Sequence, residues 1–228
     1  MFALIYHPSM LLLLPAVLLA LYANIKVRST FSRFSQVPAQ SGITGAQAAR
    51  VILEAGGTQD VVIEPIAGSL SDRYDPRTKA LRLSEPVYSR SSLAALGVAA
   101  HEAGHALQHA SGYAPLAIRN AIVPTAAFGS QLAMPLFIVG FIFVIPVLIN
   151  IGIILYAGAV FVTVLTLPVE LNASRRAMAH LRDTGAITAA EMRPTRAVLS
   201  AAALTYVAAV AVALMQLLRL LLLRGSRD

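Results

Sequence analysis

Two histidines with a glutamate between them stand in the segment HEAGH, which runs from His101 to His105. On an α-helix, positions four apart share one face about 6 Å apart along the axis, so both imidazoles can reach one zinc ion. Glu102 points elsewhere and is not a ligand, but it can reach a water molecule on the metal. A carboxylate there takes a proton from the attacking water and passes it to the leaving amine. The pattern predicts zinc-dependent hydrolysis with His101 and His105 as ligands and Glu102 as the base.

The flanking residues decide between this metal site and a surface helix with merely polar side chains. Residues 94–100 and 106–107 are apolar. A helix with such flanks is partly buried, and its histidines and glutamate are buried with it. Because a buried charge without a partner is costly, a bound metal ion explains the segment better than a surface helix does.

A catalytic zinc site usually takes a third protein ligand and leaves one position for water. His109 lies about 12 Å from His101 on a straight helix, which is too far to share the ion. The metzincin pattern needs a histidine where this chain has Ser111. Glu170 and His180 remain. Glu170 is favoured as the third ligand because it is the only carboxylate bordering the long apolar block. The alternative is that it only solvates the end of a membrane helix.

The composition is that of a membrane protein. Apolar residues make up 57% of the 228 residues and charged residues 13%, about half the usual charged share. There is no cysteine, which excludes disulfides, thiolate nucleophiles and cysteine-ligated metals. The 18 basic residues form no run with interleaved aromatic residues, and most of them flank apolar segments. They indicate membrane topology and attraction to anionic lipid, and we expect no nucleic-acid partner.

Three regions are apolar enough to lie in a bilayer, where one crossing needs about 20 residues. Residues 1–25 carry no Lys, Arg, Asp or Glu and predict an N-terminal transmembrane anchor. A cleaved signal peptide is the alternative, but the cationic start of such peptides is missing. Residues 120–169 have no formal charge and predict a transmembrane helical hairpin, and residues 197–223 predict a C-terminal transmembrane helix. The expected turn of the hairpin is marked by Pro146, Asn150 and Gly152.

The remaining residues form two polar segments. Residues 26–119 predict a soluble α+β region with the zinc-binding helix at 91–112, and two short strands at 61–65 and 79–83 are expected to form a β-hairpin. Residues 170–196 form a second polar segment with the third zinc ligand. The expected fold is therefore mainly α: a polytopic membrane protein with about four transmembrane helices and a small α+β insertion that carries the HExxH helix.

Lys and Arg counts predict the orientation of the two polar segments. The loop from 26 to 119 holds ten and the segment from 175 to 196 holds five, so both are expected to face the cytoplasm. Three arginines at the C-terminus argue mildly against this. In either case two crossings separate His105 from Glu170, which places both on the same side of the membrane.

Four longer sequence motifs resemble those of a known protein family. HEAGHALQHASGYAPL, LPVELNASRRA at 167–177, SDRYDPRTKALRLS at 71–84 and AAALTYVAA at 201–209 together resemble the YugP family of bacterial membrane zinc metallopeptidases. That family is distantly similar to the HtpX and prenyl-protein protease group. The resemblance covers nearly the whole chain. It implies a neutral zinc endopeptidase in the bacterial inner membrane, with one Zn²⁺ per chain.

The resemblance also implies roles for individual residues. In the wider group the third zinc ligand is a glutamate in a Glu-x-x-x-Asp context, which corresponds here to Glu170 followed by Ser174 instead of Asp. The missing acid would orient a histidine, and Asn172 or Asp72 could replace it. The strand at 79–83 is expected to be the edge on which an extended substrate pairs. Apart from the resemblance, stabilising an oxyanion needs a donor opposite the metal. His180 is the first choice for this further catalytic role, and the other candidates are Arg175, Arg176, Tyr74 and Tyr206.

The expected function is that of a membrane-embedded metalloendopeptidase acting on membrane-associated or misfolded proteins. Its expected partners are the lipid bilayer and a protein or peptide substrate, and a membrane regulatory partner or homo-oligomer is left open. Two other classes remain open: a zinc-dependent lipid or acyl amidase, and a weakly active regulatory membrane protein. The complete set of two histidines and two glutamates argues against a degenerate site.

Overall fold

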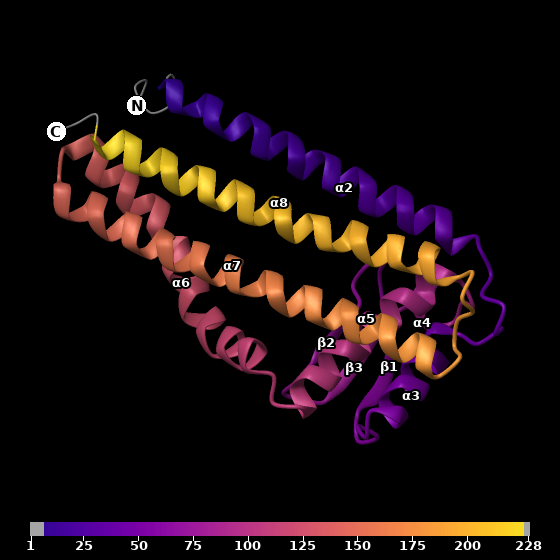
Figure 1. Cartoon of the computed structure of the whole chain (residues 1–228). Helices are drawn as coiled ribbons and strands as arrows, with labels where there is room; N and C mark the ends of the chain where they lie inside the picture. Colours follow the sequence, from indigo (N-terminus) through magenta and orange to yellow (C-terminus); the bar gives the residue numbers. More distant parts are fainter. Residues whose placement is uncertain (1–6, 226–228) are drawn as a thin grey trace. The chain divides into compact units, whose positions relative to one another are not determined.

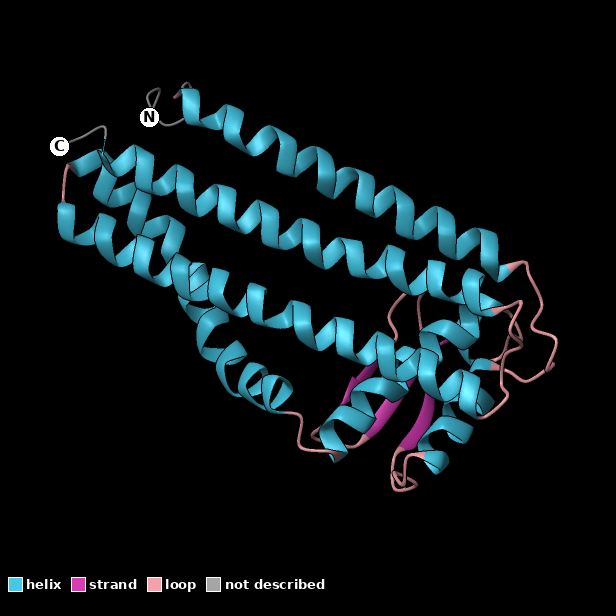
Figure 2. Cartoon of the chain, viewed as in Figure 1, coloured by secondary structure: helices cyan, strands magenta, loops and turns pink. Residues whose placement is uncertain are grey.

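Long α-helices dominate the structure, a computed structural model that describes residues 7–225 (Figures 1 and 2). Residues 1–6, the beginning of the expected anchor, lie outside the described residues. The helices are η1 (Pro8–Leu12), α2 (Leu13–Ser35), α3 (Gly45–Ala55), α4 (Glu85–Tyr88), α5 (Leu93–Ala110), α6 (Ala114–Phe143), α7 (Pro146–Asp183) and α8 (Met192–Gly225), and the strands are β1 (Val62–Ile66), β2 (Arg73–Asp75) and β3 (Ala80–Ser84).

Between residues 7 and 225, four helical segments are long and apolar enough to cross a membrane, which confirms the predicted fold class of a mainly α polytopic membrane protein. Helix α7 continues without a break through Glu170 to Asp183, so one helix carries both an apolar stretch and the candidate third ligand. The turn of the α6–α7 hairpin lies immediately before Pro146. The spanning segments are Pro8–Ser35, Ala114–Phe143, Pro146–Asp183 and Ala189–Gly225.

The chain divides into two compact units. The first comprises Met1–Asn24, Ala117–Pro168 and Thr205–Asp228. Its buried cluster contains the stacked rings of Phe137 and Phe141, whose centroids lie 5.9 Å apart. Many of its other large apolar side chains are exposed, as a lipid-facing surface requires.

The second unit comprises Ile25–Leu116 and Val169–Leu204, so it unites the two polar segments of the sequence. Helix α5 runs through its core. Ser92 caps the start of α5 by accepting a hydrogen bond from the Ala95 amide, and Gly112 with a φ of +61° follows its end, close to the predicted bounds. Its fully buried core side chains include Ile52, Leu53, Leu81, Leu83, Leu96 and Leu181.

The small sheet of this unit has the order β1–β3–β2, and this corrects the predicted hairpin. The two strands that we expected to pair antiparallel are β1 and β3, and they pair in parallel. The intervening β2 forms the antiparallel hairpin with β3 instead. Strand β3 is therefore the centre of the sheet, and the expectation that it offers a free edge to the substrate is wrong.

Arg82 explains why the pattern of β3 was misleading. Its guanidinium lies in the middle of the outer sheet face, where it donates to Glu64 of β1 at 2.6 Å and to Asp75 of β2 at 3.1 Å. Leu81 and Leu83 are fully buried on the other side. The alternation of polar and apolar residues thus predicts which face of the sheet each side chain lies on. It does not predict whether a strand has a neighbour on each side.

Candidate metal centre

Three predicted ligands meet in the second unit. His101 and His105 of α5 and Glu170 of α7 each offer a ligand atom, and these atoms lie within 4.8 Å of one another. The Nε2 atoms of His101 and His105 lie 3.2 and 3.5 Å from Oε2 of Glu170. Ligands about 2.0–2.1 Å from a tetrahedral zinc ion are separated by about 3.3 Å. The three side chains therefore fit this ion.

Burial makes the cluster dependent on a partner of opposite charge. The side chain of Glu170 is 4% exposed, and those of His101 and His105 are 14% and 12% exposed. Burial acts to lower the pKa of His105, but the carboxylates of Glu170 and Glu102 outweigh it and leave this pKa above its ordinary value. The carboxylates thus favour a positive charge among these side chains.

A glycine permits the close approach of the two helices that carry the ligands. A Cβ atom on Gly104 would lie 2.6 Å from the carbonyl oxygen of Ala173 in α7, which is closer than such atoms approach in proteins. Only a residue without a side chain lets the backbone of α7 lie here. The fourth residue of HEAGH therefore brings Glu170 within reach of the histidines.

The outer nitrogen of His105 is held by Gln108, which is fully buried. The Gln108 amide nitrogen donates to the Val169 carbonyl at 2.8 Å and to Oδ1 of Asn172 at 3.0 Å. Its Oε1 atom is therefore the acceptor for Nδ1–H of His105, at 3.0 Å. This fixes the proton on Nδ1 and leaves the Nε2 lone pair free to bind a metal.

The outer nitrogen of His101 lies 3.1 Å from the hydroxyl of Ser174. Ser174 is the residue that stands where the wider group has aspartate, and it contacts the histidine directly. The two expected substitutes do not. Asn172 acts one step away through Gln108, and Asp72 accepts hydrogen bonds from the backbone and hydroxyl of Ser84.

Gln108 was missed at the level of sequence. It follows His105 by three positions, which places both on one side of α5, and this spacing was the available signal. Its amide nitrogen donates to Val169 and Asn172, which stand 61 and 64 positions later in the sequence. No local pattern reveals partners this far away.

On its other side, α5 contacts strand β2. The backbone N–H of Tyr74 donates to Oε2 of Glu102 at 2.9 Å, and the Tyr74 hydroxyl lies 2.9 Å from Nδ1 of His109. His109 is thus outside the metal cluster, where its spacing predicted it to be, and it holds the tyrosine that contacts the predicted base.

Within residues 7–225, the cluster of ligand atoms contains none of the other oxyanion candidates. His180 lies ten residues beyond Glu170 on α7, roughly 15 Å along the helix axis, so its catalytic role stays a prediction without structural support. Arg176 donates to Asn172 at 2.9 Å and lies over the ring of Tyr113. Arg175 lines a separate pocket, and Tyr206 belongs to the first unit.

Comparison with known proteins agrees with this geometry. Residues 9–225 match the model of a family described as "putative neutral zinc metallopeptidase". A protein of Bacillus subtilis (strain 168) named "putative membrane protease YugP" is 48% identical over 205 residues, which cover 90% of this chain and 91% of that protein. No solved structure gives a significant match. The fold, the ligand cluster and these similarities lead to one assignment: the chain belongs to the YugP family of membrane zinc metallopeptidases.

Proposed function

We propose that this protein is a metalloendopeptidase that binds one zinc ion per chain through His101, His105 and Glu170. The observation that carries the proposal is the spacing of the ligand atoms. Separations of 3.2 and 3.5 Å between the histidine nitrogens and the glutamate oxygen match the roughly 3.3 Å expected around tetrahedral zinc.

Glu102 is the proposed general base. Bound zinc supplies Lewis acidity, which polarises the scissile carbonyl and makes a water molecule more acidic. Glu102 is half-buried beside the two histidines and is not part of the ligand cluster. Its carboxylate can accept the proton of the attacking water and then deliver it to the leaving amine.

Strand β2 is the proposed docking edge for an extended substrate. In a β-strand, the N–H and C=O groups of one residue point to the same side. The Tyr74 N–H points at Glu102 of α5 and not at β3. The Tyr74 carbonyl therefore also points away from β3, toward the open edge of β2. A substrate amide that donates to this carbonyl lies beside Glu102, which aligns its peptide bond with the base.

The proposed substrates are membrane-associated or misfolded proteins, because the third ligand stands on a helix that also carries a candidate membrane span.

We place the second unit on the cytoplasmic side of the bacterial inner membrane. Its two segments hold most of the basic residues of the chain, and cytoplasmic loops are rich in Lys and Arg. The chain has no native cysteine, so Arg77→Cys on the exposed sheet turn offers a single label. An impermeant maleimide should modify it in inverted vesicles and not in intact spheroplasts; the reverse result would invert the orientation.

Glu102→Gln tests the enzymatic proposal. The purified variant should keep about one zinc per chain, as in the wild type, because residue 102 is not a ligand. Cleavage of a casein-like fluorogenic substrate should fall by about 10²–10⁴-fold. Zinc content by mass spectrometry and cleavage rate are measured on the same preparation. Wild-type activity in the variant would remove Glu102 as the base, and a wild type without zinc would remove the metal centre.

A further inference from the structure

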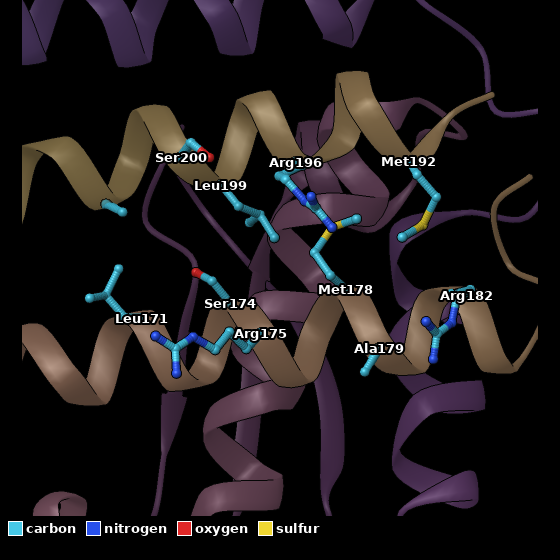
Figure 3. A pocket seen from close by; sticks show the side chains of 11 residues that line it. Leu171, Ser174, Arg175, Met178, Ala179, Arg182, Met192, Arg196, Leu199 and Ser200 are labelled. Atoms are coloured by element: carbon cyan, nitrogen blue, oxygen red, sulfur yellow. The ribbon is translucent and has the colours of Figure 1, made fainter. Parts of the chain in front are cut away.

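A second candidate site lies beside the metal centre in the second unit. A pocket of about 370 Å³ opens between α7 and α8, with residues 171–182 of α7 on one side and residues 192–203 of α8 on the other (Figure 3). Its walls combine apolar side chains with arginines, and none of the described residues that line it is acidic. The residues that matter below are Leu171, Ser174, Arg175, Arg196, Leu199 and Ala203.

Two guanidinium groups in this pocket have no counter-charge. Arg175 and Arg196 are exposed and form no hydrogen bond or ion pair with any residue between 7 and 225. In Figure 3, Arg196 extends from α8 toward Met178 of α7, and Arg175 lies on the Leu171 side of the pocket. A third arginine, Arg182, is already paired with Asp183 at 2.8 Å. The planar donors of two arginines suit the oxygens of a phosphate group.

The position of the pocket along both helices indicates the source of that phosphate. The charge-free stretch of α7 ends at Glu170, one residue before Leu171, and the apolar run of α8 begins at Ala197, one residue after Arg196. The arginines therefore stand where two candidate membrane spans become polar, at the level of lipid headgroups. Leu171, Leu199 and Ala203 continue from them toward the apolar stretches.

The pocket is separate from the metal ligands. Glu170 and Ala173 of α7 face α5, whereas Leu171, Arg175 and Met178 lie roughly 80–140° around the helix from Glu170. Ser174 is the only residue that both lines the pocket and bonds to a zinc-ligating histidine. An occupant of the pocket thus does not have to be a substrate at the metal.

We propose that this pocket binds an anionic phospholipid, with its phosphate between Arg175 and Arg196 and an acyl chain along Leu171, Leu199 and Ala203. Basic side chains next to transmembrane helices attract anionic headgroups, and the apolar wall adds burial for one chain. The proposal is independent of the zinc chemistry, because it would hold for a protein without activity.

Native mass spectrometry of the full-length protein in detergent, with added dimyristoyl phosphatidylglycerol or phosphatidylcholine, tests this site. The wild type should retain phosphatidylglycerol preferentially. Arg175→Gln/Arg196→Gln should lower its retention by about tenfold or more and leave phosphatidylcholine unchanged. The matched control is Arg90→Gln/Arg193→Gln, which removes the same charge from two exposed arginines outside the pocket and should retain the preference.

Three further results decide what the pocket binds. Equal loss in the control double variant would mean general charge attraction and would overturn the site. Displacement of the lipid by millimolar glycerol 1-phosphate would assign a free phosphate ligand instead. Binding of a polyglutamate peptide without any lipid preference would assign a protein partner. Because a misfolded variant would also lose lipid, Arg175→Lys/Arg196→Lys is measured alongside, and its retention should lie between those of wild type and the glutamine variant.

Discussion

The two sides of α5 are held in different ways. Toward α7, the backbone of Ala173 leaves no room for a side chain at Gly104, and the fully buried Gln108 bonds to three groups at once. Toward β2, Tyr74 forms hydrogen bonds with the half-buried Glu102 and the exposed His109. The first side combines close backbone approach with a fully buried amide, and the second has polar contacts within reach of water.

This difference matches the division between metal binding and substrate handling that the proposed function requires. A metal centre requires ligands whose positions do not depend on solvent, and the α7 side provides them through packing and a satisfied amide network. The β2 side must admit an extended chain and a water molecule, so its contacts have to be ones that a substrate can join. Damage to the α7 side should therefore appear as lost zinc, and damage to the β2 side as lost turnover with zinc retained.

Glu170→Gln should have the largest effect on the α7 side. The variant removes the charge that faces both histidines, so zinc affinity should fall by more than the 10–100-fold typical of outer partners of a metal site, and activity should be lost with it. Competition with a zinc chelator measures the affinity. The comparison with Glu102→Gln is direct, because each change replaces one carboxylate by an amide. Retention of wild-type zinc affinity would show that α7 does not supply a ligand.

Gly104→Ala should come next. The new Cβ atom would meet the Ala173 carbonyl oxygen at 2.6 Å, and a backbone atom cannot rotate away. We expect α7 to be displaced, at a cost of about 1–3 kcal/mol in the free energy of unfolding, with weaker zinc binding.

The matched control for this variant is Gly97→Ala in the same helix. There the new atom would lie 3.2 Å from a methyl group of Thr195, so a shift of a few tenths of an ångström would relieve the contact. Thermal unfolding and chelator competition should show a clear deficit for the Gly104 variant and a smaller effect on stability, with normal zinc binding, for the control. Equal behaviour of the two would mean that the helix contact does not position Glu170.

Gln108→Ala should lower zinc affinity by about 10–100-fold while leaving all three ligands in place. The change removes the acceptor for His105 Nδ1–H and leaves the buried Val169 carbonyl without this donor. Unchanged zinc affinity in Gln108→Ala would show that the proton on His105 is fixed in another way.

Ser174→Ala removes the corresponding contact of His101, and Ser174→Asp introduces the acid of the wider group. Zinc affinity should fall in Ser174→Ala and be retained in Ser174→Asp.

The two sides also differ in how far the sequence predicts them. His101, Glu102 and His105 follow from helical spacing alone, and Glu170 follows from being the carboxylate that borders a charge-free block. Such rules work because the ligands stand on long helices, whose geometry is set locally. The structure brings His101, His105 and Glu170 together as this spacing indicates.

The arrangement of β2 beside α5 could not be predicted, because it depends on the strand order of the sheet, which no local pattern encodes. The alternation at residues 79–83 correctly separated a buried face from a polar one. It did not show that the strand is central, with β1 on one side and β2 on the other. The predicted hairpin had no strand between residues 65 and 79, yet Arg73–Asp75 form β2 and Tyr74 contacts Glu102. A strand of three residues is too short to leave a periodic signal.

Tyr74→Phe should give the smallest effect and the sharpest test of the β2 side. It removes one partly exposed hydrogen bond to His109, worth about 1 kcal/mol, so kcat/KM should fall about fivefold. The backbone bond to Glu102 persists in the variant, so zinc content should not change. His109→Ala breaks the same bond from the other end. If the pair acts by holding β2 against α5, the double variant should lose no more than either single variant. Additive losses would mean that the two side chains do not act through their hydrogen bond. A loss of zinc in any of the three variants would mean that the two sides of α5 are not separate.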